Sequence, residues 1–164
     1  MIPANRQRNA LQSALYVAIV GVLAAVLLER LLTYAEAAEK AAMEATVSRL
    51  GAALYARTAF LALRADYDAI DALPGQSPFV AAHANASNYL GEFDGPPPGT
   101  EGGRWYFDRA RRELVYLPNL RRYLEGTDQM PVLRFRVEVQ KASKYAYTGV
   151  TLRPVGTAVW DPRP

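Results

Sequence analysis

The feature that most constrains this chain is a run of twenty residues, 9–28, without a single charged side chain. As a helix, this run would rise about 30 Å, which matches the hydrocarbon core of a lipid bilayer. Arg6 and Arg8 stand just before the run, so the positive-inside bias predicts a cytoplasmic N-terminus and an exported remainder. We therefore expect residues 1–8 to form a cytoplasmic leader and residues 9–28 to form a single transmembrane helix.

A cleaved signal peptide is the competing interpretation, with residues 35–37 as its small-residue cleavage site. The charged residues at 29–30 and the uninterrupted helical pattern count against it, because a cleavage region prefers small neutral residues. The product of cleavage would be a soluble periplasmic binding domain released by signal peptidase. Its ligand surface would be formed by three aromatic residues around a Pro/Gly-rich loop: Tyr89, Phe93 and Trp105.

Beyond the uncharged run, helix-forming residues continue with no breaker except Gly51 until Pro74. An apolar stripe follows one face of this segment at helical spacing: Met43, Val47, Leu50, Leu54 and Leu61. We expect one helix over about residues 9–64, in which an amphipathic stalk at 29–65 docks its stripe onto the protein's own head. A coiled-coil partner is the alternative, but the stripe covers few heptads.

Strand patterns fill the last third of the chain, after a loop-like region at 71–103 that is rich in proline and glycine. Aromatic and β-branched residues predict strands at 104–107 and 113–117, and strict alternation predicts a half-buried strand at 132–139. The apolar face of that last strand consists of four residues: Leu133, Phe135, Val137 and Val139.

A helix followed by several strands predicts an α+β fold. We expect the long N-terminal helix to pack on a small antiparallel β-sheet, with residues 66–164 forming a periplasmic head. The helix stripe and the apolar strand face would then be the two sides of one core.

The segment "IVGVLAAVLLERLLTY", residues 19–34, resembles the N-terminal helix of type IV pilins and type II secretion pseudopilins. Those helices carry a Gly-aliphatic-Leu-Ala-Ala core, here residues 21–25, and continue as a stalk into a β-sheet head. The segment at 88–119, which contains "NYLGEF", "RWYFD" and "ELVYL", is similar to heads of pseudopilin-like proteins from secretion and MSHA-type pilus gene clusters. The resemblance implies a pilin-like protein of the bacterial inner membrane.

Aligned on Gly21, the chain departs from this family at the leader and in the helix. The family's processing junction, a glycine followed by phenylalanine, would fall at Gln7 and Arg8. Its acidic helix residue would fall at Gln12, and its helix-breaking proline at Glu29. A prepilin peptidase should therefore not cut this leader, and the charge contact that docks one subunit onto the preceding one is missing. We infer an accessory protein that assists assembly of a type IV-type pilus or a type II-like secretion filament.

The partners that the resemblance implies are other pilins or pseudopilins, inner-membrane assembly proteins and the lipid bilayer. Within the predicted membrane helix, Gly21, Ala24 and Ala25 offer a small-residue surface that lets another transmembrane helix approach closely. The alternative is an anchor that faces only lipid.

An arginine-rich stretch is the one part of the chain that suggests nucleic acid. Its six arginines are Arg104, Arg109, Arg111, Arg112, Arg121 and Arg122. A hairpin turn and a following loop are normal places for solvated charges, and Asp108 and Glu113 partly neutralise them. The pattern therefore disfavours nucleic-acid binding.

Residues for catalysis or metal binding are sparse in this sequence. It contains no cysteine and one histidine, His83, in a loop-like segment. Asp66, Asp68 and Asp71 stand close together, but no glycine interrupts them as in a calcium loop. No phosphate-binding loop or nucleophile motif is present. We predict a protein that is not an enzyme, with no catalytic residues, no metal, no cofactor and no small-molecule substrate.

Overall fold

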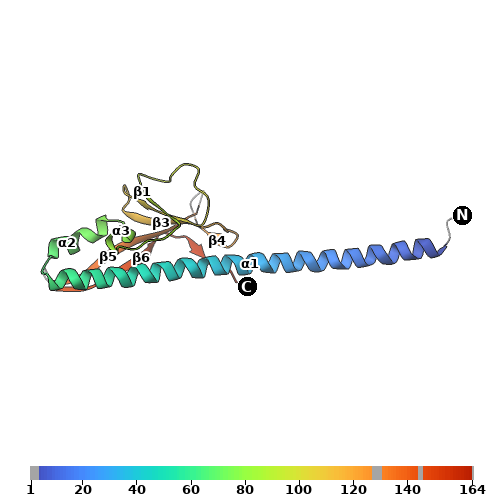
Figure 1. Ribbon diagram of the computed structural model, residues 1–164, viewed down its shortest axis with the longest axis horizontal. Coiled ribbons are helices and arrows are strands. Elements are labelled where there is room, and N and C mark those ends of the chain that lie inside the picture. Colours follow the sequence, from blue (N-terminus) through green and yellow to red (C-terminus); the bar gives the residue numbers. More distant parts are fainter. Residues whose placement is uncertain (1–3, 127–130, 144–145, 164) are drawn as a thin grey trace.

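The computed structural model describes residues 4–126, 131–143 and 146–163 of the chain. It is dominated by α1 (Ala4–Leu63), a single helix of 60 residues. Figure 1 shows α1 running along the head in its second half and projecting far beyond it toward the N-terminus. No proline lies within α1, so nothing in its sequence removes a backbone hydrogen bond or forces a kink.

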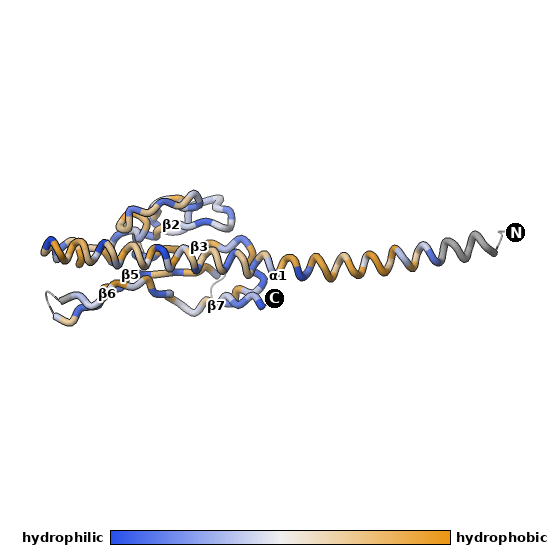
Figure 2. Tube along the Cα trace, turned by 60° about the horizontal axis from the view of Figure 1, so that its bottom comes forward, coloured by the Kyte–Doolittle hydropathy of each residue, from blue (hydrophilic) through white to orange (hydrophobic). Residues whose placement is uncertain are grey.

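The projecting half of α1 is apolar and uncovered. Every residue from Gln12 to Leu32 is exposed, and Figure 2 shows an almost continuous hydrophobic colour along this part of the helix. By length and composition, α1 is the one helix in the described part of the chain that could cross a membrane, and its apolar segment lies near the N-terminus.

After α1 the chain turns back through three short helical pieces: α2 (Tyr67–Ala72), the 3₁₀ turn η1 (Leu73–Gly75) and α3 (Pro78–Ala81). Asp66 caps α2 by accepting a hydrogen bond from the backbone N–H of Ala69 at 3.3 Å. These pieces bury Ile70 and Phe79 against the head, so they close the far end of the core.

The head contains a five-stranded sheet in the order β1-β2-β3-β5-β6. Its strands are β1 (Tyr89–Phe93), β2 (Arg104–Asp108), β3 (Glu113–Leu117), β5 (Leu133–Ser143) and β6 (Ala146–Val155). Two short strands, β4 (Leu124–Glu125) and β7 (Val159–Trp160), pair separately near the middle of α1. The predicted α+β fold is confirmed. The sequence did not predict β1, which pairs with β2 in parallel and makes the sheet mixed.

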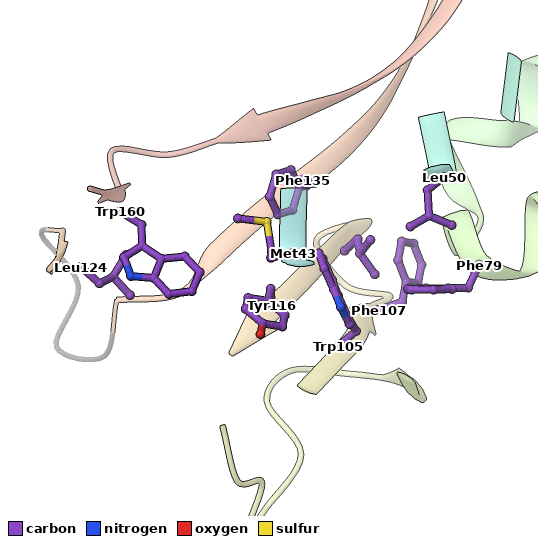
Figure 3. Packing of buried hydrophobic residues seen from close by; sticks show 10 residues of the cluster. Met43, Leu50, Phe79, Trp105, Phe107, Tyr116, Leu124, Phe135 and Trp160 are labelled. Atoms are coloured by element: carbon purple, nitrogen blue, oxygen red, sulfur yellow. The ribbon is translucent and has the colours of Figure 1, made fainter. Parts of the chain in front are cut away.

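The second half of α1 covers one face of this sheet, and the structure places the stripe and the strand face together. Met43, Leu50 and Phe135 lie in one buried cluster with Trp105, Tyr116 and Trp160 (Figure 3). Leu54, Leu61 and Val137 lie in a second buried cluster. The remaining predicted core residues pack against these clusters: Val47 and Leu133 on the first, and Val139 on the second.

Candidate functional site: the exposed helix and the base of the head

The helix surface that projects from the head is the first part of the candidate site. Gly21, Ala24 and Ala25 lie in its middle and are exposed, and no atom lies within 4 Å of the position that a Cβ on Gly21 would take. A neighbouring helix could therefore approach closely at this point. The large apolar side chains around it, such as Val20 and Leu23, are both 64% exposed.

The second part is a contact between helix carboxylates and the lower end of the head. Glu36 is only 2% exposed although it is charged. Its Oε1 accepts a hydrogen bond from the indole Nε1–H of Trp160 at 2.8 Å and another from the backbone N–H of Tyr123 at 3.0 Å. These bonds give a buried anion the donors that it needs, and they join α1 to β7 and to the loop before β4.

Glu39 makes a similar contact one turn further along α1. Its Oε1 accepts the Tyr116 hydroxyl at 2.8 Å and the backbone N–H of Asn119 at 2.7 Å. Its Oε2 accepts the backbone N–H of Leu120 at 3.0 Å. Burial raises the pKa of Tyr116, and its hydrogen bond to Glu39 raises that pKa further. We call Glu36, Glu39 and the loop 118–123 that they hold the carboxylate clasp.

The contact continues down the helix to the end of the uncharged run. Thr33 lies 3.3 Å from the Tyr123 hydroxyl, and Arg122 donates to Glu29 at 2.8 Å. The hydrogen bond to Glu29 raises the pKa of Arg122. The head therefore reaches down α1 as far as the residue that directly follows Leu28.

A close backbone approach supports the clasp loop from the other side. The N–H of Gly103 donates to the Leu117 carbonyl at 2.6 Å. A Cβ on Gly102 would lie 2.3 Å from Cα of Asn119, which is a contact that no side chain can make. Glycine is required at this position so that the Pro/Gly-rich loop can lie directly against the clasp loop.

Sequence reasoning missed the clasp, although a signal for it was present. Glu36 precedes Met43 by seven residues and Glu29 precedes Glu36 by seven, so both acids continue the face of the apolar stripe. Acids on the core-facing side of a helix require donors from another element. Which element supplies them could not be read from the stalk alone.

The other candidate residues are dispersed. Four of the six arginines lie on or between β2 and β3, whereas Arg121 and Arg122 lie at the clasp. Asp66 caps α2, and Asp71 bonds to Tyr147. His83 is exposed at a backbone turn with φ of 51°.

The three aromatic residues of the alternative ligand surface do not share a surface. Trp105 is 1% exposed in the main core, and Tyr89 stacks on Phe79 at the edge of that core. Phe93 packs edge-on against Tyr106 on the opposite face of the sheet. The loop between these residues therefore does not collect them around one ligand.

An apolar groove lies beside the clasp. It is lined by Met43 and Val47 of α1, by Phe135 of β5 and by Trp160, with a Lys40–Glu44 ion pair of 3.8 Å among its polar lining residues. Such a groove can seat an apolar side chain. Among the described residues, no three histidine, aspartate or glutamate side chains gather as metal ligands would.

Comparisons with protein-family models, with curated proteins and with solved structures found no match for this chain. The long apolar N-terminal helix packed on a small β-sheet is nevertheless a pilin-like architecture.

Proposed function

We propose that this chain is a pilin-like protein of the bacterial inner membrane that assists assembly of a type IV-type pilus or a type II-like secretion filament through protein–protein contacts. The observation that carries the proposal is α1 itself. One unbroken helix exposes an apolar surface over residues 12–32 and then forms one side of the core of the head. Exposed apolar surface of this extent marks a membrane or protein contact.

The clasp argues against release of the head by signal peptidase. The expected cleavage site, residues 35–37, includes Glu36, which is buried and bonded to Trp160 and Tyr123. Cutting there would leave two donors at the base of the head without their acceptor, which costs free energy for each buried group. The uncut chain is therefore the form in which the head is complete.

The outer face of the stalk supports contacts with other long helices. Small exposed residues recur on this face at alternating spacings of three and four: Ala38, Ala41, Ala45, Ser48 and Ala52. A helix with such a face can lie close to a neighbouring helix because no large side chain holds the two apart. In the proposed function, this face and the small residues at 21–25 are where pilin or pseudopilin helices pack.

An accessory role is proposed from the N-terminal residues. Gln7 and Arg8 stand where the resembling family has its processing junction, and Gln12 stands where that family has a carboxylate. A neutral Gln12 needs no partner charge in the membrane, since an unpaired carboxylate there would be costly. The protein would thus contact a growing filament at one end or at its base and would not be its repeating subunit.

Deletion of the gene in its own bacterium, followed by complementation, tests this proposal. We expect loss of surface filaments or of the secreted product, restored by the full chain and restored poorly by Ala45→Arg. Thr148→Arg is the matched control, because Thr148 is also exposed but lies on β6, away from the stalk face. The same membranes should retain the protein during alkaline carbonate extraction, and its intact mass should match an uncut chain.

Three results would contradict the proposal. Release of the protein by carbonate would show that α1 does not anchor it in the membrane. Unchanged filaments and secretion in the deletion strain would show that the protein is not needed for assembly. Recovery of the protein from sheared filaments at the level of the major subunit would show that it is a repeating subunit and not an accessory protein.

A further inference from the structure

The side of α1 that faces away from the head is uncovered and carries a regular repeat. Steps of four and three residues in alternation, starting at Leu27, meet ten residues and end at Ala59; none is charged and all are exposed. We call these ten residues the outer seam. At about 100° per residue they lie about half a turn from the buried stripe between Met43 and Leu61. In Figure 2, α1 crosses in front of the strands of the head with nothing over this side.

The outer seam has the spacing of a surface that packs on another long helix. Four of its residues are large, namely Leu27, Leu31, Tyr34 and Tyr55, and they are between 55% and 62% exposed. The other six are alanine or serine, which let two helix axes approach to about 8 Å. The seam covers 33 residues, which is more than four heptads, whereas the stripe on the other side is used by the head. It also continues at the same spacing into the apolar half of α1 through Ala24 and Val20.

The charges beside the seam indicate which helix packs there. Glu44 precedes seam residue Ala45 on one flank, and Arg49 follows seam residue Ser48 on the other flank. In a parallel pair of helices in the same register, flanking residues five apart meet across the interface. Glu44 of each copy would therefore lie opposite Arg49 of the other copy, and the twofold symmetry would form this ion pair twice.

Both charged groups are accessible for such a contact. Glu44 is exposed, and its ion pair with Lys40 of the same helix is 3.8 Å long and exposed, so it holds Glu44 only weakly. Among the described residues, no ion pair involves Arg49, which donates to the Ala45 carbonyl and to the Thr46 hydroxyl at 3.3 Å each.

Nothing else on the flanks opposes the pairing. Apart from Glu44 and Arg49, the flanking residues between positions 35 and 56 are all alanine or glycine: Ala35, Ala37, Ala42, Gly51 and Ala56. No like charges would therefore meet in this part of the interface. Two copies anchored in one membrane with the same topology also share one direction, as a parallel pair requires.

We infer that the outer seam of α1 packs against the outer seam of a second copy of this chain, as a parallel pair of helices in register that runs from the membrane into the stalk. The two heads would then lie on opposite outer sides of the pair, because each head occupies the far side of its own helix. The inference rests on the proposed function, in which this face packs on a pilin-like helix. It adds that the partner is a second copy and that Glu44 and Arg49 fix the register.

Cysteine cross-linking tests the pairing with the full chain in its own membranes. The sequence contains no cysteine, so each introduced thiol is the only one in the chain. The seam variants are Ala41→Cys and Ser48→Cys. The matched control is Ala42→Cys, which is exposed on the same helix one residue beside the seam. Two differently tagged copies are expressed together, and the membranes are oxidised and separated without reductant. We expect a band of doubled mass that carries both tags for the seam variants and little of it for the control.

Charge exchange tests the identity of the partner. Glu44→Arg and Arg49→Glu each place two like-charged pairs in a dimer of identical chains, so each should lower the dimerisation constant by about tenfold, measured as the yield of the Ala41→Cys cross-link at low expression. A Glu44→Arg chain expressed with an Arg49→Glu chain restores two opposite-charge pairs. The cross-link that carries both tags should then return to the yield of the parent.

Several results would overturn the inference while leaving the membrane anchor of the proposed function intact. They are equal cross-linking of the seam variants and Ala42→Cys, no self-cross-link at the seam, and charge variants that behave like their parent. A seam cross-link only to a different protein would also overturn it, although such a contact would agree with the proposed packing on another pilin-like helix. Release of the protein by alkaline carbonate would overturn the proposed anchor itself.

Discussion

Replacing the two clasp glutamates by glutamine should have unequal effects, because the two carboxylates use their oxygens differently. Glu36 receives both of its hydrogen bonds on Oε1, so the single carbonyl oxygen of a glutamine can accept both. Glu39 receives bonds on both oxygens, so a glutamine must turn its NH₂ group toward a backbone N–H. Two donors would then face one another at the clasp loop.

The magnitudes follow from the bonds that are lost. Glu36→Gln keeps both bonds but loses their charge-assisted part, while it also removes a desolvated anion, so we expect a loss of about 1 kcal/mol in unfolding free energy. Glu39→Gln leaves the Leu120 N–H unsatisfied and should cost about 2–3 kcal/mol. Glu36→Ala leaves two buried donors without an acceptor and should cost about 3 kcal/mol.

Urea unfolding of the full chain in detergent measures these differences. The two tryptophans of the sequence, Trp105 and Trp160, are both buried in the head, so their fluorescence reports its unfolding. With a slope of about 1–3 kcal/mol per molar urea, Glu36→Ala should lower the midpoint by about 1–3 M. Glu44→Gln is the control, since Glu44 is exposed, and should change stability by less than about 0.5 kcal/mol. If Glu39→Gln proves no less stable than Glu36→Gln, the assignment of acceptors in the clasp is wrong.

Three further outcomes follow from the core, the glycine contact and an exposed ion pair. Leu54→Ala should cost about 3–4 kcal/mol because Leu54 is 0% exposed, whereas Leu63→Ala, at 88% exposed on the same helix, should change the urea midpoint little. Gly102→Ala should lower the melting temperature of the head, because the new Cβ would collide with the clasp backbone; an unchanged melting temperature would refute that contact. The hydrogen bond from Lys141 holds the pKa of the Asp71 carboxyl below its ordinary value, with a smaller contribution from a tyrosine hydroxyl. A lowered pKa stabilises the fold above the ordinary aspartate pKa, so the stability difference between wild type and Asp71→Asn should shrink as the pH falls through and below that value and should not grow.

The buried faces of the helix and of the central strand could be predicted from the sequence because each follows from a local period. The stripe from Met43 to Leu61 and the alternation at 132–139 each lie within one element, so a period of 3.6 or 2 identifies the buried face. The α+β fold followed from the order of these patterns along the chain.

The clasp and β1 could not be predicted in the same way, because both depend on contacts between distant segments. Glu36 is buried by Tyr123 and Trp160, which lie 87 and 124 residues further along the chain. β1 contains Gly91, with φ of 110°, and its pairing with β2 is irregular there. The sequence of β1 is typical of a loop, and the segment becomes a strand because it pairs with β2.

The absence of any break in α1 has a mechanical consequence. Each residue of a helix turns the chain by about 100° and lifts it by about 1.5 Å, so the azimuth and height of the head are set by counting residues from the small-residue surface at 21–25. One alanine inserted between Leu28 and that surface would swing the head about 100° around the helix axis and leave the clasp intact. Seven inserted residues would return it to within about 20° of its original azimuth but about 10 Å higher. The number of residues between the small-residue surface and the clasp therefore sets the direction in which the head points from the helix axis.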